Sequence, residues 1–411
     1  MSGPTLVELP KDNYSFGAAG TKLTIIGGIV GLLALGGAAA MGVAADDHLG
    51  RFLHAYLLAF YFVLTIALGC LFFVGIQYLF RSGWSVTVRR LAELGAGVLP
   101  VLAVLALPII VSVAMGNHSL YPWTDHEVVS QSHLLEHKAP YLNLNFFLVR
   151  CVVYFAIWAL LSWYFLSSST KQDSSGDPKL TRRMEIVSGP ATLLFALTLT
   201  FASIDFIMSL APTWFSTMIG VYFFAGACTS SLSFLILFAM ALQKSGRMTQ
   251  VLNTEHYHDL GKLLFGFTFF WSYICFSQFM LIWYANIPEE TEFYLHRFQG
   301  PWYWFSWFLL LGHWAFPMAG LLSRHVKRNR KGLAFFAVWL LVMHYVDIAW
   351  YVLPTVGGHD AHGIPFGPME VLSWVGMVGI FLAVVGFLGS RRSLVPLKDP
   401  RVTEALSFEN I

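Results

Sequence analysis

The stretch LLVMHYVDIAWYVLPT, residues 340–355, is apolar enough to span a membrane but carries His344 and Asp347 within one helical turn of each other. An ionisable side chain near the bilayer centre costs at least ~2.5–3.5 kcal/mol on insertion scales, and such residues usually mark a pathway or a site. We therefore expect a membrane span whose carboxylate has either a functional role or a structural one, in a hydrogen bond to a neighbouring helix.

The composition of the whole chain indicates an integral membrane protein. Of its 411 residues, 56% are hydrophobic and only 12% are charged, whereas soluble domains carry about 25% charged residues. The four cysteines all lie in apolar runs and form no CxxC pair, so neither a disulfide framework nor an iron–sulfur ligand set is expected. The first apolar run is a full span rather than a signal peptide, and no nucleotide or nucleic-acid motif is present.

Apolar runs of about 20 residues, the length that crosses a bilayer, predict an all-α polytopic membrane protein with about ten transmembrane helices. We expect the spans at roughly 22–45, 52–80, 87–114, 141–167, 184–210, 214–243, 259–287, 302–325, 332–354 and 368–390. Residues 1–21 and 391–411 then form an N-terminal segment and a C-terminal tail outside the membrane.

The distribution of Lys and Arg predicts the orientation, because cytoplasmic loops are enriched in these residues. Of the 25 Lys and Arg residues, 21 fall in segments on the side of the two termini, three in the loops of the other side, and Arg150 inside a span. Both termini are therefore expected in the cytoplasm. The outer loop 115–140 is instead rich in histidine and acid, and its HLLEH (133–137) matches a zinc-peptidase pattern, but no third ligand is evident and no metal site is expected.

An internal repeat is predicted from a pattern that occurs twice. SIDFIMSLAPT (203–213) and YVDIAWYVLPT (345–355) share D-x6-P-T, which pairs Asp205 with Asp347 at an offset of 142 residues. The offset covers four spans, so we expect spans two to five to recur as spans six to nine, in parallel orientation.

The polar, Ser- and Gly-rich segment 168–183 is predicted to be a flexible cytoplasmic linker. It would join a first half, 22–167 with spans one to four, to a second part, 184–390 with spans five to ten.

Arg150 lies about 15 Å below the outer end of its span at 1.5 Å per residue. An unpaired guanidinium at that depth is costly, and Asp205 in the next span has a compatible depth. We therefore expect the two to pair, either as a structural link or as a gate.

His313 and His344 are expected roughly 18 and 15 Å below the outer face, on consecutive spans. Two interpretations compete for them. One is a pair of haem ligands, since facing histidines hold b-type haem; the other, which we favour, is a polar relay of His344, Asp347 and His313.

Near the cytoplasmic face, Glu93, Glu185, Asp259 and Lys262 lie in the first turns of spans three, five and seven. They are either interfacial ions or the inner mouth of a path. In the second case a proton path would run from Glu93, Glu185 and Lys262, past the two histidines, to Asp347, Asp205 and Arg150, since chains of ionisable groups are how protons cross bilayers.

Three stretches carry a resemblance to a known family: LLEHKAPYLNLNFFLVRCVVYFAIW (134–158), IDFIMSLAPTWFSTMIGVYFFAG (204–226) and HYHDLGKLLFGFTFFWSYICFSQFMLIWYANIPEET (256–291). They resemble the NrfD-like family, the membrane subunits of polysulfide reductases, and most closely its branch of F subunits of alternative complex III. That complex is a bacterial quinol:cytochrome c (or high-potential iron–sulfur protein) oxidoreductase. The resemblance covers spans four to seven strongly, and the rest in span number and length.

This resemblance implies two four-helix bundles flanked by one helix at each end, in a bacterial inner membrane. It implies as partners a second NrfD-like subunit, multihaem and monohaem cytochrome c subunits, an iron–sulfur subunit, a small membrane subunit, lipids and, in some settings, a terminal oxidase. Haem and iron–sulfur clusters would belong to those partners, and no cofactor is expected in this chain. The implied role is proton movement or structural support of the complex, without a redox centre in this chain.

Two further functions stay open on the residues themselves. One is a quinone site in this chain near His344 and Asp347, because a quinone needs an apolar slot with a His or a carboxylate to take its proton. The other is a free-standing transporter, which parallel repeats and charges at the membrane midplane would permit.

Overall fold

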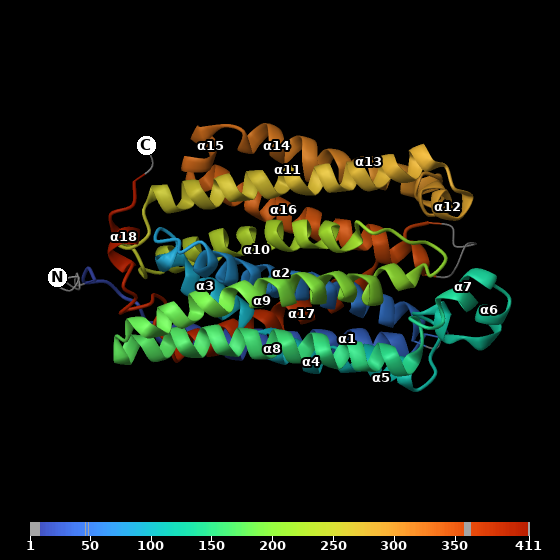
Figure 1. The fold of residues 1–411 in the computed structure, drawn as a ribbon, viewed down its shortest axis with the longest axis horizontal. Coiled ribbons are helices and arrows are strands. Elements are labelled where there is room, and N and C mark those ends of the chain that lie inside the picture. Colours follow the sequence, from blue (N-terminus) through green and yellow to red (C-terminus); the bar gives the residue numbers. More distant parts are fainter. Residues whose placement is uncertain (1–8, 46, 48, 357–362, 410–411) are drawn as a thin grey trace.

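The computed structural model describes residues 9–45, 47, 49–356 and 363–409, and these form an all-α polytopic membrane protein (Figure 1). Within the described residues, nine helical segments are long and apolar enough to cross a membrane. They are α1 (Gly17–Val43), α2 (Gly50–Leu79), the run α3 (Val86–Ala96), α4 (Leu99–Leu105) and α5 (Leu107–Ala114), α8 (Leu144–Ser175), α9 (Pro178–Phe206) with η2 (Met208–Leu210), α10 (Ile219–Lys244), α11 (Thr254–Ala285), α16 (Arg330–Val352) with η4 (Leu353–Thr355), and α17 (Pro368–Ser390).

The eighth expected span, 302–325, is broken into three pieces rather than one helix. It consists of α13 (Gly300–Leu310), a π-helical turn η3 (Leu311–Ala315) and α14 (Phe316–Leu321). Pro317 has no N–H to donate to the carbonyl four residues earlier, and a π turn is one way in which a helix absorbs such a defect. The break places His313 inside the irregular turn.

The core is built around α2 and α10, which lie side by side and are almost entirely buried. Helix α2 also packs on α3 and α9, and α8 packs on α9 and α4. Helix α10 packs on α11 and α16, and α14 packs on both of these. Figure 1 shows α10 and α2 between α11, α13 and α14 on one side and α8 and α4 on the other. The sequence repeat itself stays a prediction.

The expected flexible linker at 168–183 is wrong. Helix α8 continues to Ser175 and α9 begins at Pro178, so only Gly176 and Asp177 separate them. Gly176 ends α8 in the left-handed conformation with φ 65°, which glycine adopts without strain. The Asp177 side chain then caps α9 by accepting from the Lys179 backbone N–H at 2.9 Å. The polar residues therefore mark where the helices leave the membrane, not where they end.

The described parts of both chain ends lie at one end of the molecule, which we call the terminal end (Figure 1). The C-terminal tail is folded onto this end: Leu394 N–H donates to Tyr14 O at 2.8 Å, and the short helix α18 (Val402–Leu406) packs on α3. The opposite end, which we call the loop end, carries three short helices, α6 (His126–Ser130), α7 (His133–Lys138) and α12 (Pro288–Arg297). Helix α15 (Arg324–Arg328) lies at the terminal end.

The first and last spans, α1 and α17, pack closely against each other along a seam of glycines. A Cβ atom on Gly27 would lie 2.7 Å from the carbonyl oxygen of Gly379, and one on Gly386 would lie 2.7 Å from that of Gly20. Small residues let helix backbones approach in a membrane, where van der Waals packing drives association. Helices α1 and α17 therefore form one packed pair, which we call the α1–α17 unit, rather than two separate flanking helices.

The seam yields a first prediction with a neighbouring control. Gly27→Leu places a side chain against the α17 backbone, so it should destabilise the chain by about 1–3 kcal/mol through overpacking. Gly28→Leu should be neutral or slightly stabilising, because a Cβ there meets nothing within 4 Å. The measurement is thermal unfolding of the detergent-purified protein. Equal melting temperatures for the two variants would contradict the close packing of α1 against α17 at Gly27.

Candidate functional site

Asp347 is a fully buried carboxylate on α16, held by two neutral donors. The Tyr222 hydroxyl of α10 donates to Oδ1, and the indole Nε1–H of Trp271 in α11 donates to Oδ2 at 3.0 Å. Among the described residues no Lys, Arg or His forms an ion pair with it. The two donors replace part of the water that a carboxylate loses on burial, but they supply no compensating charge.

His313 lies against one of these donors. Its ring stacks on Trp271 with centroids 3.9 Å apart and an interplanar angle of 25°. The imidazole is fully buried, and neither ring nitrogen has a hydrogen-bond partner in the described part of the chain. Buried polar groups are usually satisfied, so the two ring nitrogens are positions at which a water molecule would bind. Its position in the π turn fits the frequent use of such turns at functional sites.

His344, one turn before Asp347 on α16, points to a different helix. Its Nε2 is 2.8 Å from the Thr65 hydroxyl of α2, and its Nδ1 has no partner among the described residues. The His344 ring packs against Gly226 of α10, where there is no room for a larger residue: a Cβ on Gly226 would lie 2.9 Å from His344 Cε1. The expected relay is thus only partly formed: the three groups cluster, but no direct hydrogen bond joins either histidine to Asp347.

Asp205 pairs with Arg150, as the depth argument predicts. The guanidinium of α8 donates through Nε to Asp205 Oδ2 at 2.7 Å and through Nη2 to Oδ1 at 2.8 Å, and the Tyr154 hydroxyl donates to Oδ2 at 2.7 Å. Arg150 Nη1 also donates to Tyr141 O at 2.9 Å, with the Tyr141 ring 3.9 Å away. Bidentate pairs of this kind are the stronger ion pairs, and the contact ties α8 to α9.

The two matched aspartates therefore have different partners. Within the described residues, the side-chain hydrogen bonds to Asp205 on α9 come from α8, whereas those to Asp347 on α16 come from α10 and α11. Both carboxylates are fully buried, so they face the protein rather than lipid. Their shared D-x6-P-T pattern does not extend to a shared environment.

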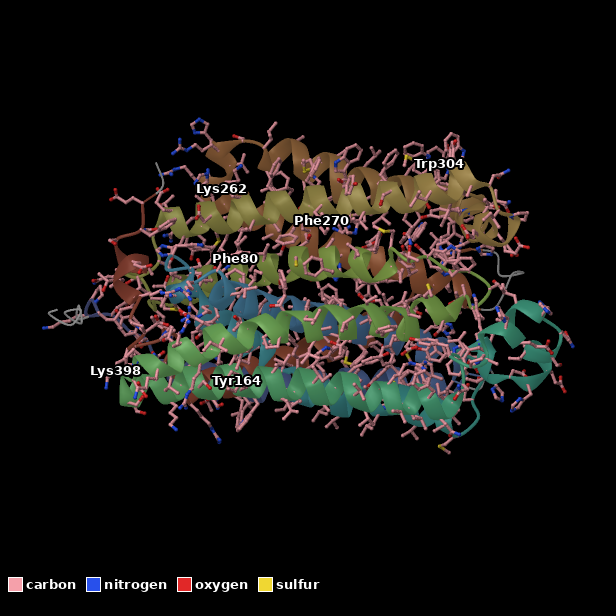
Figure 2. The ribbon with its side chains drawn as sticks, viewed as in Figure 1. Phe80, Tyr164, Lys262, Phe270, Trp304 and Lys398 are labelled. Carbon is pink, nitrogen blue, oxygen red and sulfur yellow. The ribbon has the colours of Figure 1, made fainter. Side chains whose placement is uncertain are left out.

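The four ionisable residues predicted near the cytoplasmic face form separate ion pairs at the terminal end, not the inner mouth of a single path. Glu93 is buried between Arg90, at 2.9 Å, and Arg89. Glu185 contacts three arginines, Arg81, Arg182 and Arg401. Lys262 pairs with Asp259 at the half-exposed start of α11. Figure 2 shows Lys262 and Lys398 at the terminal end, on opposite sides of the molecule, and Trp304 toward the loop end.

The Glu93 cluster continues into the C-terminal tail. Arg90 Nη1 also donates to Asp173 of α8 at 2.9 Å and to Ser393 O at 3.1 Å, and Arg89 donates to Asp399. Glu93 Oε1 is left without a hydrogen-bond donor in the described residues. The cluster is thus a buried group of charges at the terminal end of α3, closed from outside by the tail.

Between the Asp347 group and the Glu93 cluster lies a row of buried hydroxyl side chains that was not predicted from the sequence. Residues 227–233 of α10 read ACTSSLS, and Thr229, Ser230, Ser231 and Ser233 are all buried. They follow Gly226, the residue beside His344, toward the terminal end. Ser231 faces α2, where a Cβ on Gly69 would lie 2.5 Å from its Oγ, and Ser233 Oγ has no described partner. The sequence does carry a signal for this row, because four polar residues in the five positions 229–233 are unusual for a membrane span.

Arg297 was also missed, because the sequence places it in an outer loop. It is 3% exposed at the end of α12 and donates to Trp350 O at 3.0 Å and Tyr351 O at 3.2 Å. A cation against the last carbonyls of a helix is favourable, so Arg297 closes the loop end of α16 about one turn above Asp347.

An aromatic cavity of about 520 Å³ borders the Asp347 group. Its walls include Tyr222 and Trp271, the two donors to Asp347, and Gln278 of α11. Gln278 is 2% exposed; its Oε1 accepts from Tyr351 at 2.9 Å, while its Nε2 has no partner among the described residues. The cavity therefore offers an unused donor in an apolar, ring-lined space.

A smaller cavity of about 320 Å³ lies at the loop end beside the Asp205 pair. Lys138 of α7 lines it and donates to Pro212 O at 2.6 Å, and burial lowers the pKa of this lysine. The HLLEH histidines and Glu136 lie on α7, and in the described residues no group of three His, Cys, Asp or Glu could hold a metal ion.

No family model matches the chain, and no match was found among curated proteins. The site must therefore be interpreted from its own chemistry.

The Arg150–Asp205 pair gives a second prediction. Asp205→Asn leaves a buried guanidinium without its counter-charge and should destabilise the chain by about 3–5 kcal/mol. Adding Arg150→Met removes the stranded charge, so the double variant should regain much of the lost stability. Thermal or denaturant unfolding of the two variants against wild type measures the difference. If the double variant were less stable than Asp205→Asn, the ion-pair account would be wrong.

Proposed function

We propose that this chain is a membrane subunit of a bacterial quinol-oxidising electron-transfer complex of the alternative complex III type, and that it carries protons rather than electrons. The three resembling stretches and the all-α polytopic fold with about ten spans support this assignment. Its partners would be the cytochrome c subunits, the iron–sulfur subunit and the second NrfD-like subunit, which would hold the haems and clusters. The terminal end would face the cytoplasm of the bacterial inner membrane, in line with the Lys and Arg distribution.

The observation that carries the proton role is the environment of Asp347. In general a fixed cation favours the charged form of a neighbouring carboxylate, because protonation of the carboxylate would leave the cation without its counter-charge. Asp347 has only neutral donors, so it can gain or lose a proton without breaking an ion pair. Intramembrane carboxylates and histidines of this kind form proton relays in pumps and transporters.

The proposed route follows the buried hydroxyls of α10 from the side of the terminal end to His344, and Glu93, which pairs with Arg90 and Arg89, lies outside it. From there it passes His313 and reaches Asp347, with water molecules bridging the groups that have no direct contact. Ring nitrogens without partners on both histidines, and Ser233 Oγ, are where such waters would bind. Asp205 and Arg150 form a structural link outside this route, and Glu185 and Lys262 belong to separate ion pairs at the terminal end.

Asp347→Asn tests the route. It removes the exchangeable proton, so the assembled complex in proteoliposomes should move fewer protons per electron. Asn offers one acceptor for two donors, so a stability loss of about 1–3 kcal/mol is expected as well.

The matched control is Tyr222→Phe, which removes one hydrogen bond to Asp347 but keeps the carboxylate. It should lose similar stability and keep most of the wild-type proton stoichiometry. Wild-type stoichiometry in an assembled Asp347→Asn complex would show that the carboxylate is structural.

A second candidate function, quinone binding, is favoured by the aromatic cavity beside Asp347. A quinone ring would pack against its aromatic walls, and a ring carbonyl would accept from the unused Gln278 Nε2–H. Tyr222, which links the cavity to Asp347, would connect the quinone oxygen with a proton carrier.

Quenching of tryptophan fluorescence by a short-chain quinone tests this candidate, because three tryptophans line the cavity. Gln278→Leu should weaken quenching severalfold, since it removes a hydrogen bond worth about 0.5–1.5 kcal/mol. Ser277→Ala is the control, because Ser277 bonds only to Ile274 O and lies outside the cavity walls. Equal quenching in wild type and Gln278→Leu would exclude the cavity as the quinone site.

A further inference from the structure

An open groove of about 860 Å³ lies on the surface of the helices, among side chains that a membrane would surround. Its walls come from five helices: α1, α2, α10, α16 and α17. It starts near Phe366 at the loop end and reaches Phe16 and Ser245 at the terminal end, so it follows the depth of the membrane. Nearly all of its lining is apolar, and part of it is exposed, with Val342 51% accessible.

The walls of the groove do not suit another helix. Helix interfaces in membranes use small residues that let backbones approach, as the glycine seam between α1 and α17 does in this molecule. The groove is instead lined mainly by large side chains, among them Phe62, Phe234, Phe238, Trp374 and Phe381. Gaps between rings of this size fit flexible hydrocarbon chains, which adjust to an irregular wall as a rigid helix cannot.

The terminal end of the groove carries a positive rim. Arg247 lies next to Ser245 and donates to its Oγ at 2.8 Å, with its guanidinium 6.0 Å from the Phe16 ring centroid. Its Nε donates to Ser15 O at 2.9 Å, while Nη2 makes no hydrogen bond and the side chain no ion pair within the described residues. The charge of Arg247 is therefore held at the groove but not neutralised.

A second cation lies close to this rim. Ser15, which accepts from Arg247, pairs through its backbone with Ser393, the residue after Arg392. Burial, together with the neighbouring Arg90 and Arg391, lowers the pKa of Arg392. Positive charges thus gather where α17 leaves the membrane, and basic pockets between spans on the cytoplasmic side recognise anionic lipid headgroups.

We propose that this groove binds an anionic phospholipid, with its phosphate at Arg247 and its acyl chains along α10 and α16 toward Phe62 and Trp374. The lipid would fill the space between α10, α16 and the α1–α17 unit, and so would link these helices. This site is independent of the Asp347 route, and its test does not depend on proton movement.

The test is native mass spectrometry of the full chain, delipidated in detergent and then titrated with phosphatidylglycerol or with phosphatidylcholine of the same acyl chains. Wild type should retain one phosphatidylglycerol in preference to phosphatidylcholine. Arg247→Gln should bind it about fivefold more weakly, as expected for one basic residue at a lipid headgroup, and Arg247→Lys should keep most of the affinity.

A second pair of variants tests the groove itself. Ala241 is exposed on the groove wall, so Ala241→Trp should fill the space and abolish retention. Ala156 is exposed on α8 away from the groove, and Ala156→Trp should bind lipid as wild type does. Equal binding of the two lipids by wild type, or undiminished phosphatidylglycerol binding by Arg247→Gln, would overturn the proposal.

Discussion

Inside the hydrocarbon layer a charged group has no water around it, so its partners must come from the protein. This chain meets that constraint in two ways at matched positions of its sequence. Asp205 receives a bidentate guanidinium, which compensates its charge and ties α8 to α9. Asp347 receives only a hydroxyl and an indole N–H, which hold its oxygens in place without compensating the charge. The first arrangement compensates the charge with a cation, and the second supplies hydrogen bonds alone.

Much of the fold could be predicted from the sequence, because each span is a long apolar run and such runs have few other structures available. The errors lie in a segment that is polar yet helical and in a span that is apolar yet not one continuous helix. The segment 168–183 is polar yet mostly helical, since α8 and α9 simply continue beyond the membrane. Span eight is apolar yet broken, and its signal was Pro317, which hydropathy does not detect.

The candidate site was predictable where two charges had to meet. Arg150 and Asp205 could be paired from depth alone, because a lone guanidinium at that level is too costly. The donors to Asp347 could not be found in this way, since Tyr222 and Trp271 are ordinary residues for a span and only the rotation of α10 and α11 turns them inward. The position of a residue along its span predicts its depth in the membrane. Its partner depends instead on the side of the helix from which its side chain projects.

The seam between α1 and α17 has a consequence for how the molecule is made. Helix α1 leaves the ribosome before α17, but the glycine surface it packs against belongs to that later helix. Until α17 is synthesised, α1 must remain in the bilayer with its narrow glycine face covered by lipid or by an insertion factor. Closure of the seam would then be a late step in the assembly of these helices, because it must wait for α17.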